Sequence, residues 1–378
     1  MARKVVVLGV AVTKFARETA LGVDEMAKEA ALMALEDAGM SYKDIQVGFC
    51  GNVYQVGAAP FAFYSLGKTG IPITRLDIAC TSSSKGVHLG AYMIEAGACD
   101  SCLVIGVEKM PRGMVPMPVE GVSFKSLVDG LMGLITMPGS YAHKASRHMH
   151  LYGSKPEHFA RVSVKAHKNG CLNPNATYQK ALTLEEVMES RMISYPITMY
   201  QCCANANGAS AVVLCSAEKA RQYTTKPVYL AGWGEASMKY TKGDPIETYL
   251  SDGDTGLAGK KAYHKAGIGP EDVDVVQVHD AFSVGEITSL EALGLCPAGE
   301  GAVFAWEGNT EIDGKLPVNT DGGLLSCGHP LGASGGRMIT EVVLQLMGQA
   351  GRRQVKNPRV ALVQNSGIGA SNVMVFKV

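Results

Sequence analysis

The strongest constraint on the fold is an order of elements that occurs twice in the 378 residues. Apolar residues 5–9 predict a buried strand, and the periodicity of residues 24–38 predicts a helix that ends at a glycine. Residues 228–232 and 259–266 repeat this order. The repeat extends to four dipeptides at equal intervals, Ala38-Gly39 before Asp44-Ile45 and Ala266-Gly267 before Asp272-Val273. This agreement favours a duplicated fold.

Each half continues with a strand, a glycine-containing loop, a helix and another strand. The expected segments are 75–79, 85–96 and 102–107 in the first half, and 273–278, 335–349 and 360–364 in the second. Such alternation predicts an α/β fold with largely parallel sheets covered by helices. We place the N-terminal half at residues 1–225 and the C-terminal half at residues 226–378.

Residues 110–200 do not fit the repeat and are interpreted as an inserted, partly helical loop or lid in the first half. Thr183 and Glu186 have the spacing of a helix capping box. Several methionines of the insertion could form an adaptable apolar pocket, although core packing explains them equally well. They are Met110, Met114, Met117, Met132 and Met137.

Charge and cysteine content exclude several functional classes. The 35 Lys and Arg residues balance the 35 Asp and Glu residues. The resulting net charge of zero argues against a protein that mainly binds nucleic acid or an anionic membrane. Only 19% of the residues are charged, which indicates extensive burial or oligomeric contact. The longest uncharged stretch, residues 193–217, is too polar to span a membrane. Ten irregularly spaced cysteines and no export signal predict a cytoplasmic protein with free thiols.

Cys80 lies between a predicted strand and a predicted helix. At such an elbow the helix N-terminus stabilises a thiolate and can lower the pKa of a cysteine, which would make Cys80 a nucleophile. Burial as a small apolar side chain explains Cys80 about equally well from this segment alone.

Three further segments follow strands or contain special residues. His279 ends an alternating strand, where ligands of α/β sheets collect, although a structural, hydrogen-bonded histidine explains it about equally well. Ser283 and Glu286 behind it have the spacing of a second capping box. His329 lies in a glycine-rich loop and is followed by proline, which keeps it out of helical geometry. Residues 365–369, Asn-Ser-Gly-Ile-Gly, follow the last core strand, where glycine amides could line an oxyanion site.

The other reactive clusters are interpreted as structural, so no metal site is expected. The Cys99 and Cys102 pair has zinc spacing but no second pair at metal-site distance, and Cys202-Cys203 is also interpreted as structural. The histidines at 143–150 alternate with Lys144 and Arg147, which favours a solvated helix face or a contact with coenzyme phosphates.

Together these segments resemble the four active-site blocks of the thiolase superfamily, in that family's order. The blocks are Ala79-Cys80, His279-Asp-Ala-Phe282, Gly328-His-Pro-Leu-Gly-Ala-Ser-Gly335 and Asn365-Ser-Gly-Ile-Gly369. The resemblance covers nearly the whole chain and is strongest to thiolases of the sterol-carrier-protein and archaeal types, which include acetyl-CoA acetyltransferases. It implies the duplicated five-layer α/β/α/β/α thiolase fold with a loop domain inserted in the first half.

The resemblance also assigns roles. Cys80 would be the acylated nucleophile and His329 its base, while His279 and His329 would form the first oxyanion site. Gly367 and the Cys80 amide would form the second oxyanion site. Thiolases carry a second cysteine for proton transfer, but the corresponding positions here hold Asn365 and Ala281.

Three candidates therefore remain for the second acid/base. They are His279, Cys327 in the glycine-rich loop beside the substrate, and a water held by His279 and Asn365. We favour His279, directly or through water, because it follows a strand end and can hold a proton near neutral pH.

The implied function is thiolytic cleavage of a 3-oxoacyl-CoA, or the reverse Claisen condensation. Coenzyme A would be a co-substrate, and no cofactor is expected. The resemblance further implies a homodimer and a small zinc-ribbon/OB-fold partner protein. The acyl group of the substrate could range from acetoacetyl to aromatic groups such as benzoylsuccinyl. Two alternatives stay open, a non-catalytic scaffold subunit that binds CoA esters and a condensing enzyme of the hydroxymethylglutaryl-CoA or ketoacyl synthase kind.

Overall fold

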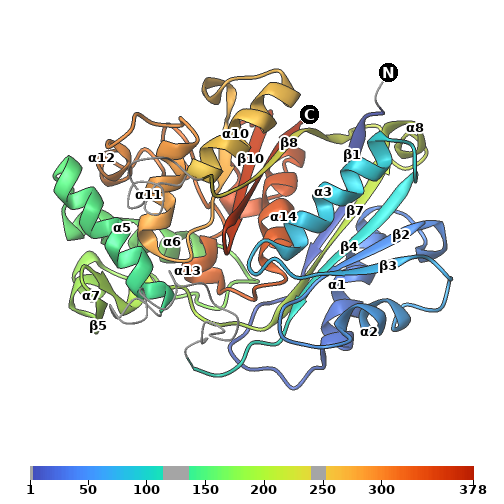
Figure 1. The fold of residues 1–378 in the computed structure, drawn as a ribbon, viewed down its shortest axis with the longest axis horizontal. Coiled ribbons are helices and arrows are strands. Elements are labelled where there is room, and N and C mark those ends of the chain that lie inside the picture. Colours follow the sequence, from blue (N-terminus) through green and yellow to red (C-terminus); the bar gives the residue numbers. More distant parts are fainter. Residues whose placement is uncertain (1–2, 114–135, 240–252) are drawn as a thin grey trace.

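The computed structural model describes residues 3–113, 136–239 and 253–378. Within these residues one mixed sheet of nine strands has the order β3-β2-β4-β7-β1-β8-β11-β10-β9, and β5 and β6 pair separately (Figure 1). The strands are β1 (Val5–Val12), β2 (Val47–Gly51), β3 (Ile73–Leu76), β4 (Ser101–Glu108), β5 (Met192–Ser194), β6 (Ile197–Thr198), β7 (Gly208–Ser216), β8 (Val228–Ser237), β9 (Val275–Gln277), β10 (Val360–Gly367) and β11 (Ala370–Lys377).

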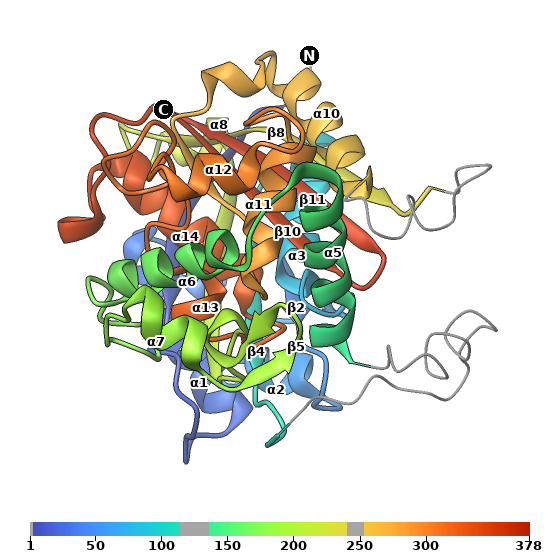
Figure 2. The same cartoon turned by 90° about the vertical axis from the view of Figure 1, so that its left-hand side faces the viewer.

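The helices cover the sheet and build a separate lobe. They are α1 (Val23–Asp37), α2 (Ala58–Tyr64), α3 (Ser82–Glu95), α5 (Met137–Tyr152), α6 (Pro156–Gly170), α7 (Leu184–Glu189), α8 (Ala217–Ala220), α10 (Gly253–Ala266), α11 (Ser283–Ala292), α12 (Gly301–Trp306), α13 (Gly323–Cys327) and α14 (Ser334–Met347). Helices α5, α6 and α7 lie together toward the viewer in Figure 2, with α12 close to α6.

Helices α3 and α14 contact each other and form the central layer of the molecule (Figure 1). Their apolar side chains share one core with strands of both halves. On the outer faces, α1 and α2 pack on the strands of the first half and α10 packs on those of the second. The predicted five-layer arrangement is thus confirmed.

The two halves bury their outer helices in the same way. A Cβ atom at Gly9 of β1 would lie 2.2 Å from the carbonyl oxygen of Ala34 in α1. One at Gly232 of β8 would lie 2.3 Å from the carbonyl oxygen of Ala262 in α10. Glycine lets each helix approach its strand this closely. The boundary at residues 225 and 226 stays a prediction.

The strand directions differ from the expectation of largely parallel sheets. Parallel pairs occur toward the two edges, where β2 pairs with β3 and β4, and β9 pairs with β10. The centre is antiparallel, because β1, β7, β8 and β11 join the two halves edge to edge. The parallel groups carry the predicted elbow and the His279 segment at their carboxyl ends.

One of the two predicted capping boxes forms. In α7 the amide of Glu186 donates to Thr183 Oγ1 at 3.1 Å, and the Glu186 carboxylate accepts from the amide of Thr183 at 2.8 Å. The second prediction is wrong, although α11 begins at Ser283 as expected. Ser283 Oγ donates to Gln201, and Glu286 is buried in an ion pair with Lys165. Long-range partners have taken both side chains.

The inserted region is partly helical, as predicted, with α5, α6 and α7 in its described part. Met114, Met117 and Met132, expected to contribute to an apolar pocket, lie outside the described residues. No helix that the structure describes is long and apolar enough to cross a membrane.

Candidate active site

Cys80 occupies a strained elbow between β3 and α3. The preceding residue, Ala79, has a φ of 46°, in the left-handed region that residues other than glycine rarely adopt. The elbow is held by Ser82 Oγ, which donates to the Ala79 carbonyl at 2.7 Å and accepts from the amide of Ile78 at 2.9 Å. Cys80 therefore lies at the N-terminal end of α3, as the sequence predicts.

The fold brings Cys80, His279 and His329 together from distant parts of the chain. The Cys80 sulfur and one ring nitrogen of each histidine lie within 4.8 Å of one another. The two imidazole rings meet edge to face, with centroids 5.1 Å apart. His279 follows β9, and His329 comes from the loop between α13 and α14. A thiol beside two imidazoles can perform nucleophilic catalysis with proton transfer.

The hydrogen bonds of His329 define which ring nitrogen carries its proton. Ser334 Oγ donates its only hydrogen to the carbonyl of Pro330 at 2.8 Å, so it must accept from His329 Nδ1 at 2.7 Å. A neutral His329 then has its lone pair on Nε2, which is buried without a hydrogen-bond partner among the described residues. Burial first, then His279 and Arg337, lower the pKa of His329 well below its usual range. His329 is thus neutral and ready to accept a proton.

Asn365 connects the two sides of the site. Its Nδ2 donates to the carbonyl of Cys80 at 3.0 Å and to Ser84 Oγ at 2.9 Å, so its Oδ1 must be the acceptor for His279 Nδ1 at 2.9 Å. A neutral His279 therefore carries its proton on the ring nitrogen that faces Asn365. The asparagine fixes both the His279 ring and the elbow.

Gly367 closes the site from the end of β10. A Cβ atom there would lie 2.4 Å from the carbonyl oxygen of Ile78 and 2.9 Å from Thr81 Cγ2. Only glycine allows this contact between the strand and the Cys80 elbow. The backbone segments of Gly367 and Cys80, predicted to supply the second oxyanion site, are accordingly packed against each other.

The electrostatics of Cys80 differ from the sequence-based expectation. Although Cys80 keeps some solvent access, the surrounding protein desolvates its thiol and raises its pKa to about 12, with a smaller contribution from Glu108. The expected lowering by the helix N-terminus is therefore overturned for the free protein. The thiol is protonated at rest and needs a base at the moment of attack.

Comparison with known proteins agrees with this site. The model of the thiolase N-terminal domain matches residues 5–218, and the thiolase C-terminal domain-like model matches residues 249–376. The chain belongs to the thiolase family. This membership favours an acyltransferase over the two alternatives, a scaffold subunit and a synthase-type condensing enzyme.

The relatives include both predicted types of thiolase. An acetyl-CoA acetyltransferase of Methanothermobacter thermautotrophicus is 37% identical over 97% of this chain and 96% of its own length. Sterol carrier protein 2 of Gallus gallus is 34% identical over 100% of this chain and 72% of its own length. The benzoylsuccinyl-CoA thiolase subunit BbsB of Thauera aromatica is 35% identical over 97% of this chain and 95% of its own length.

Among solved structures, a chain of the Ltp2-ChsH2(DUF35) aldolase superposes with a TM-score of 0.88 and 25% identity. The match covers 99% of this chain and 98% of that chain. The whole thiolase fold is shared, including both halves and the insertion's described part.

Glu108, which the sequence analysis missed, supports the thiolase site through its hydrogen bonds to the backbone. The Glu108 carboxylate accepts hydrogen bonds from the amides of Val53, Tyr54 and Gly332, each at 3.0 Å. Burial raises its pKa to about 7. Gly332 belongs to the His329 loop, so Glu108 ties this loop to the strand ends of the first half. No local pattern identifies Glu108, since it reads as an ordinary strand end.

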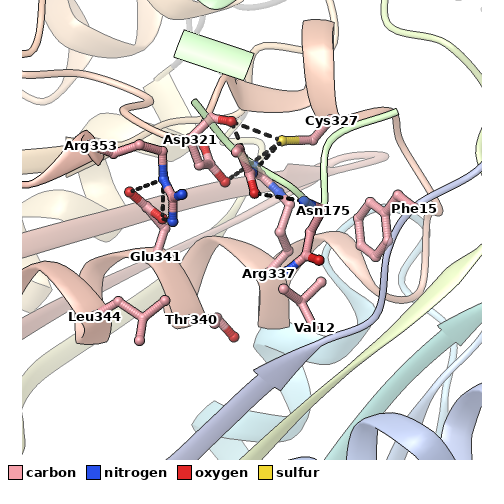
Figure 3. Close-up of a pocket in the computed structure, with 11 residues that line it drawn as sticks. Val12, Phe15, Asn175, Asp321, Cys327, Arg337, Thr340, Glu341, Leu344 and Arg353 are labelled. Atoms are coloured by element: carbon pink, nitrogen blue, oxygen red, sulfur yellow. Dashed lines mark hydrogen bonds and ion pairs between the residues drawn. The ribbon is translucent and has the colours of Figure 1, made fainter. Parts of the chain in front are cut away.

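Cys327 lies elsewhere, against the expectation that it contacts the substrate. Its sulfur is 3.2 Å from the carbonyl oxygen of Asp321, 3.4 Å from Asn173 Nδ2 and 3.7 Å from Arg337 Nη1 (Figure 3). The adjoining cavity of about 30 Å³ is too small for a CoA ester and has room only for molecules of the size of water. Gly328 follows Cys327 with a φ of 87° and turns the chain, so that His329 reaches the thiolase site and Cys327 does not.

Proposed function

We propose that this thiolase-family chain cleaves a 3-oxoacyl-CoA with coenzyme A, or runs the reverse Claisen condensation, through an acyl-Cys80 intermediate. The observation that carries the proposal is the His329 imidazole, which has a ring nitrogen within 4.8 Å of the Cys80 sulfur and whose Nε2 is buried without a partner among the described residues. A neutral base beside a protonated thiol allows attack without a resting thiolate.

The residues then divide the work. His329 takes the Cys80 proton as the sulfur attacks the 3-oxo carbon, and the resulting Nε2–H donates to the oxyanion that develops. His279, held by Asn365, organises this first oxyanion site together with His329. The amides of Cys80 and Gly367 form the second oxyanion site. Donors fixed in advance stabilise the transition state without reorganisation.

No metal is part of this proposal. A thiolate and two imidazoles are ligands that Zn²⁺ accepts. The reaction uses the same atoms for acyl and proton transfer, so a bound metal ion would block them. We therefore propose coenzyme A and its esters as the small molecules of this site, without a cofactor.

The test is mass spectrometry of the purified chain after addition of a 3-oxoacyl-CoA without free coenzyme A. We expect the acyl mass on the peptide that contains Cys80. Acyl mass on the peptides of Cys327 or Cys99 instead, with Cys80 unmodified, would contradict the assignment.

A homodimer is proposed from the exposed edge of the sheet. Strand β3 pairs only with β2 among the described strands and leaves its other edge open. Near it in sequence, Val56, Phe61 and Tyr64 are 93%, 63% and 54% exposed. Light scattering of the purified chain measures the mass directly, and a monomer at micromolar concentration would contradict this proposal.

A small partner protein with a zinc ribbon and an OB fold is proposed on two comparisons. The structurally similar aldolase contains a DUF35 component, and BbsB is named as a subunit.

We also propose a cytoplasmic location, supported by the ten cysteines, all of which are free. Co-purification of the chain with the products of its neighbouring genes tests the proposed partner. The preferred acyl group is found by assaying a panel of acetoacetyl, longer and aromatic 3-oxoacyl-CoA esters.

A further inference from the structure

Cleavage of a 3-oxoacyl-CoA needs a second proton carrier besides His329. When the C2–C3 bond breaks, its electron pair stays on C2 as an enolate, which must take a proton before the shorter CoA ester leaves. Condensation requires the reverse transfer at the same carbon. The inference below rests on the proposed function, because it names the group that performs this step.

The backbone places Cys203 between the two catalytic histidine segments. The amide of Cys203 donates to the carbonyl of Ala281 at 2.8 Å, and the carbonyl of the next residue, Ala204, accepts from the amide of His329 at 2.8 Å. The three-residue segment 202–204 therefore bridges the His279 block and the His329 loop, although about 75 to 125 positions of sequence separate it from them.

The pairing also fixes the side on which the Cys203 side chain lies. Cys202 and Phe282 form an antiparallel bridge, so Cys203 is opposite Ala281. Opposite residues of an antiparallel pair project to the same face, with Cβ atoms about 5 Å apart. Both side chains belong to one apolar cluster. The thiol of Cys203 thus stands beside the methyl group of Ala281, two residues after His279.

The electrostatic environment agrees with this position. Burial raises the pKa of Cys203 well above its usual range, and Cys202, Cys80 and Asp280 each raise it further. A negative charge on Cys80 therefore disfavours a thiolate at Cys203. Acylated Cys80 carries no charge, so this repulsion is absent at the step that follows. Cys203 nevertheless keeps some solvent access, as a group that meets substrate requires.

The sequence-based candidates fit this step less well. The proton of neutral His279 faces Asn365, so His279 could donate only as an imidazolium. Its ring centroid is 5.1 Å from that of His329, which is itself an imidazolium after accepting the Cys80 proton, and the two positive charges would repel. Cys327 bonds to Asp321 and lies outside the site.

We propose that Cys203 is the second acid/base of this thiolase site. In cleavage, the Cys203 thiol gives its proton to C2 of the enolate and becomes a thiolate. Coenzyme A then transfers its thiol proton to the Cys203 thiolate and attacks the acyl group on Cys80. The Cys80 sulfur leaves and recovers its proton from the His329 imidazolium. Every proton and bond is accounted for, and no other reactant is needed.

The experiment separates carbon protonation from acyl transfer. Cys203→Ala and Cys203→Ser are compared with Cys202→Ser, a matched control whose sulfur faces the Thr198 carbonyl at 3.5 Å. One measurement follows deuterium incorporation at C2 of acetyl-CoA in D2O. The other follows acylation of Cys80 by acetyl-CoA, read as peptide mass. This step needs no proton at carbon, and in a Cys203 variant coenzyme A can still leave as its thiolate. Thermal unfolding verifies that each variant is folded, and the serine variant serves if the alanine variant is not.

We expect both Cys203 variants to lose about 10²- to 10⁴-fold in deuterium exchange while Cys80 is still acylated, and Cys202→Ser to retain both activities. Normal exchange in a folded Cys203 variant would overturn the inference and return the role to His279 or water. Loss of exchange in Cys202→Ser to the same extent would also overturn it, because the effect would then be structural. Failure of the unchanged chain to acylate Cys80 would instead refute the proposed function.

Discussion

Cys80 and Cys327 are thiols in two regions of the molecule with opposite surroundings. Burial raises the pKa of both, to about 12 for Cys80 and higher for Cys327. Cys80 lies beside the His329 imidazole, whose Nε2 has no partner among the described residues, whereas Cys327 is engaged by Asp321 and Arg337. A proton acceptor, and not a low resting pKa, therefore distinguishes the reactive thiol here.

The charged groups around the two cysteines differ in the same sense. Around Cys327, Arg337 pairs with Asp321, and Arg353 pairs with Glu341 at 2.9 Å (Figure 3). Near Cys80, the Glu108 carboxylate is held by amides and no cation pairs with it in the described residues. The Cys327 cluster is thus built for stability, and the Cys80 site keeps its titratable groups available for chemistry.

The largest expected effect comes from removing each thiol in turn. Cys80→Ala should lower thiolysis by about 10⁴-fold or more, as loss of a nucleophile does in other enzymes. Cys327→Ala should leave the rate per folded molecule close to that of the unchanged chain. Loss of 3-oxoacyl-CoA absorbance in the presence of coenzyme A measures both. Equal losses in the two variants would remove the distinction drawn above.

Next in size is the stability cost of opening the Cys327 cluster. Arg337→Met leaves Asp321 buried without its partner and should lower the free energy of unfolding by about 3–5 kcal/mol. Arg337→Met combined with Asp321→Leu should recover much of this loss, because no uncompensated charge remains. Urea denaturation measures both variants. If Arg337→Met alone were as stable as the parent, the Arg337–Asp321 ion pair would not contribute to stability.

His329→Ala should lower turnover by about 10²- to 10³-fold through the lost oxyanion donor alone, and further through the lost base. Alkylation of Cys80 by iodoacetamide should slow in parallel. Ser334→Ala, which removes only the Nδ1 partner, is the matched control and should have a smaller effect on both rates. If His329→Ala kept normal alkylation and turnover, neither proposed role of His329 would stand.

The smallest effect is a difference in pH dependence between the two regions. Glu108 has a pKa of about 7 in the folded protein against 4.5 as a free side chain, so the folded state binds the proton more tightly. Its contribution to stability therefore falls as the pH rises from 4.5 to about 7. The pKa of Asp321 is lowered by Arg337 and Arg353 despite burial, so its contribution is constant over this range and is lost only in stronger acid.

Urea unfolding of Glu108→Gln and Asp321→Asn across this range checks the difference. Glu108→Gln should gain stability relative to the parent as the pH rises. Asp321→Asn should be less stable than the parent by a constant amount. A constant difference for Glu108→Gln would show that Glu108 is ionised throughout.

Local sequence patterns predicted the elements and the order of the functional segments. Apolar periodicity and helix-ending glycines located α1, α3 and α14 to within a few residues. Strand ends and the Pro330 neighbour identified Cys80, His279 and His329 because these signals are local. The spacing of the repeat predicted the duplication, and the resemblance to thiolases implied the five layers, in which each half buries its outer helix on its own strands.

Which side chains meet could be learned only from the folded chain. The capping pattern at Ser283 and Glu286 lost to Gln201 and Lys165, the latter 121 positions away. Burial outweighed the helix N-terminus at Cys80. Cys203 gave no sequence signal, because its neighbours His329 and Ala281 come from remote segments. Local patterns fix where the backbone turns, but side-chain direction, desolvation and the tautomer of each histidine depend on contacts that exist only after the chain has folded.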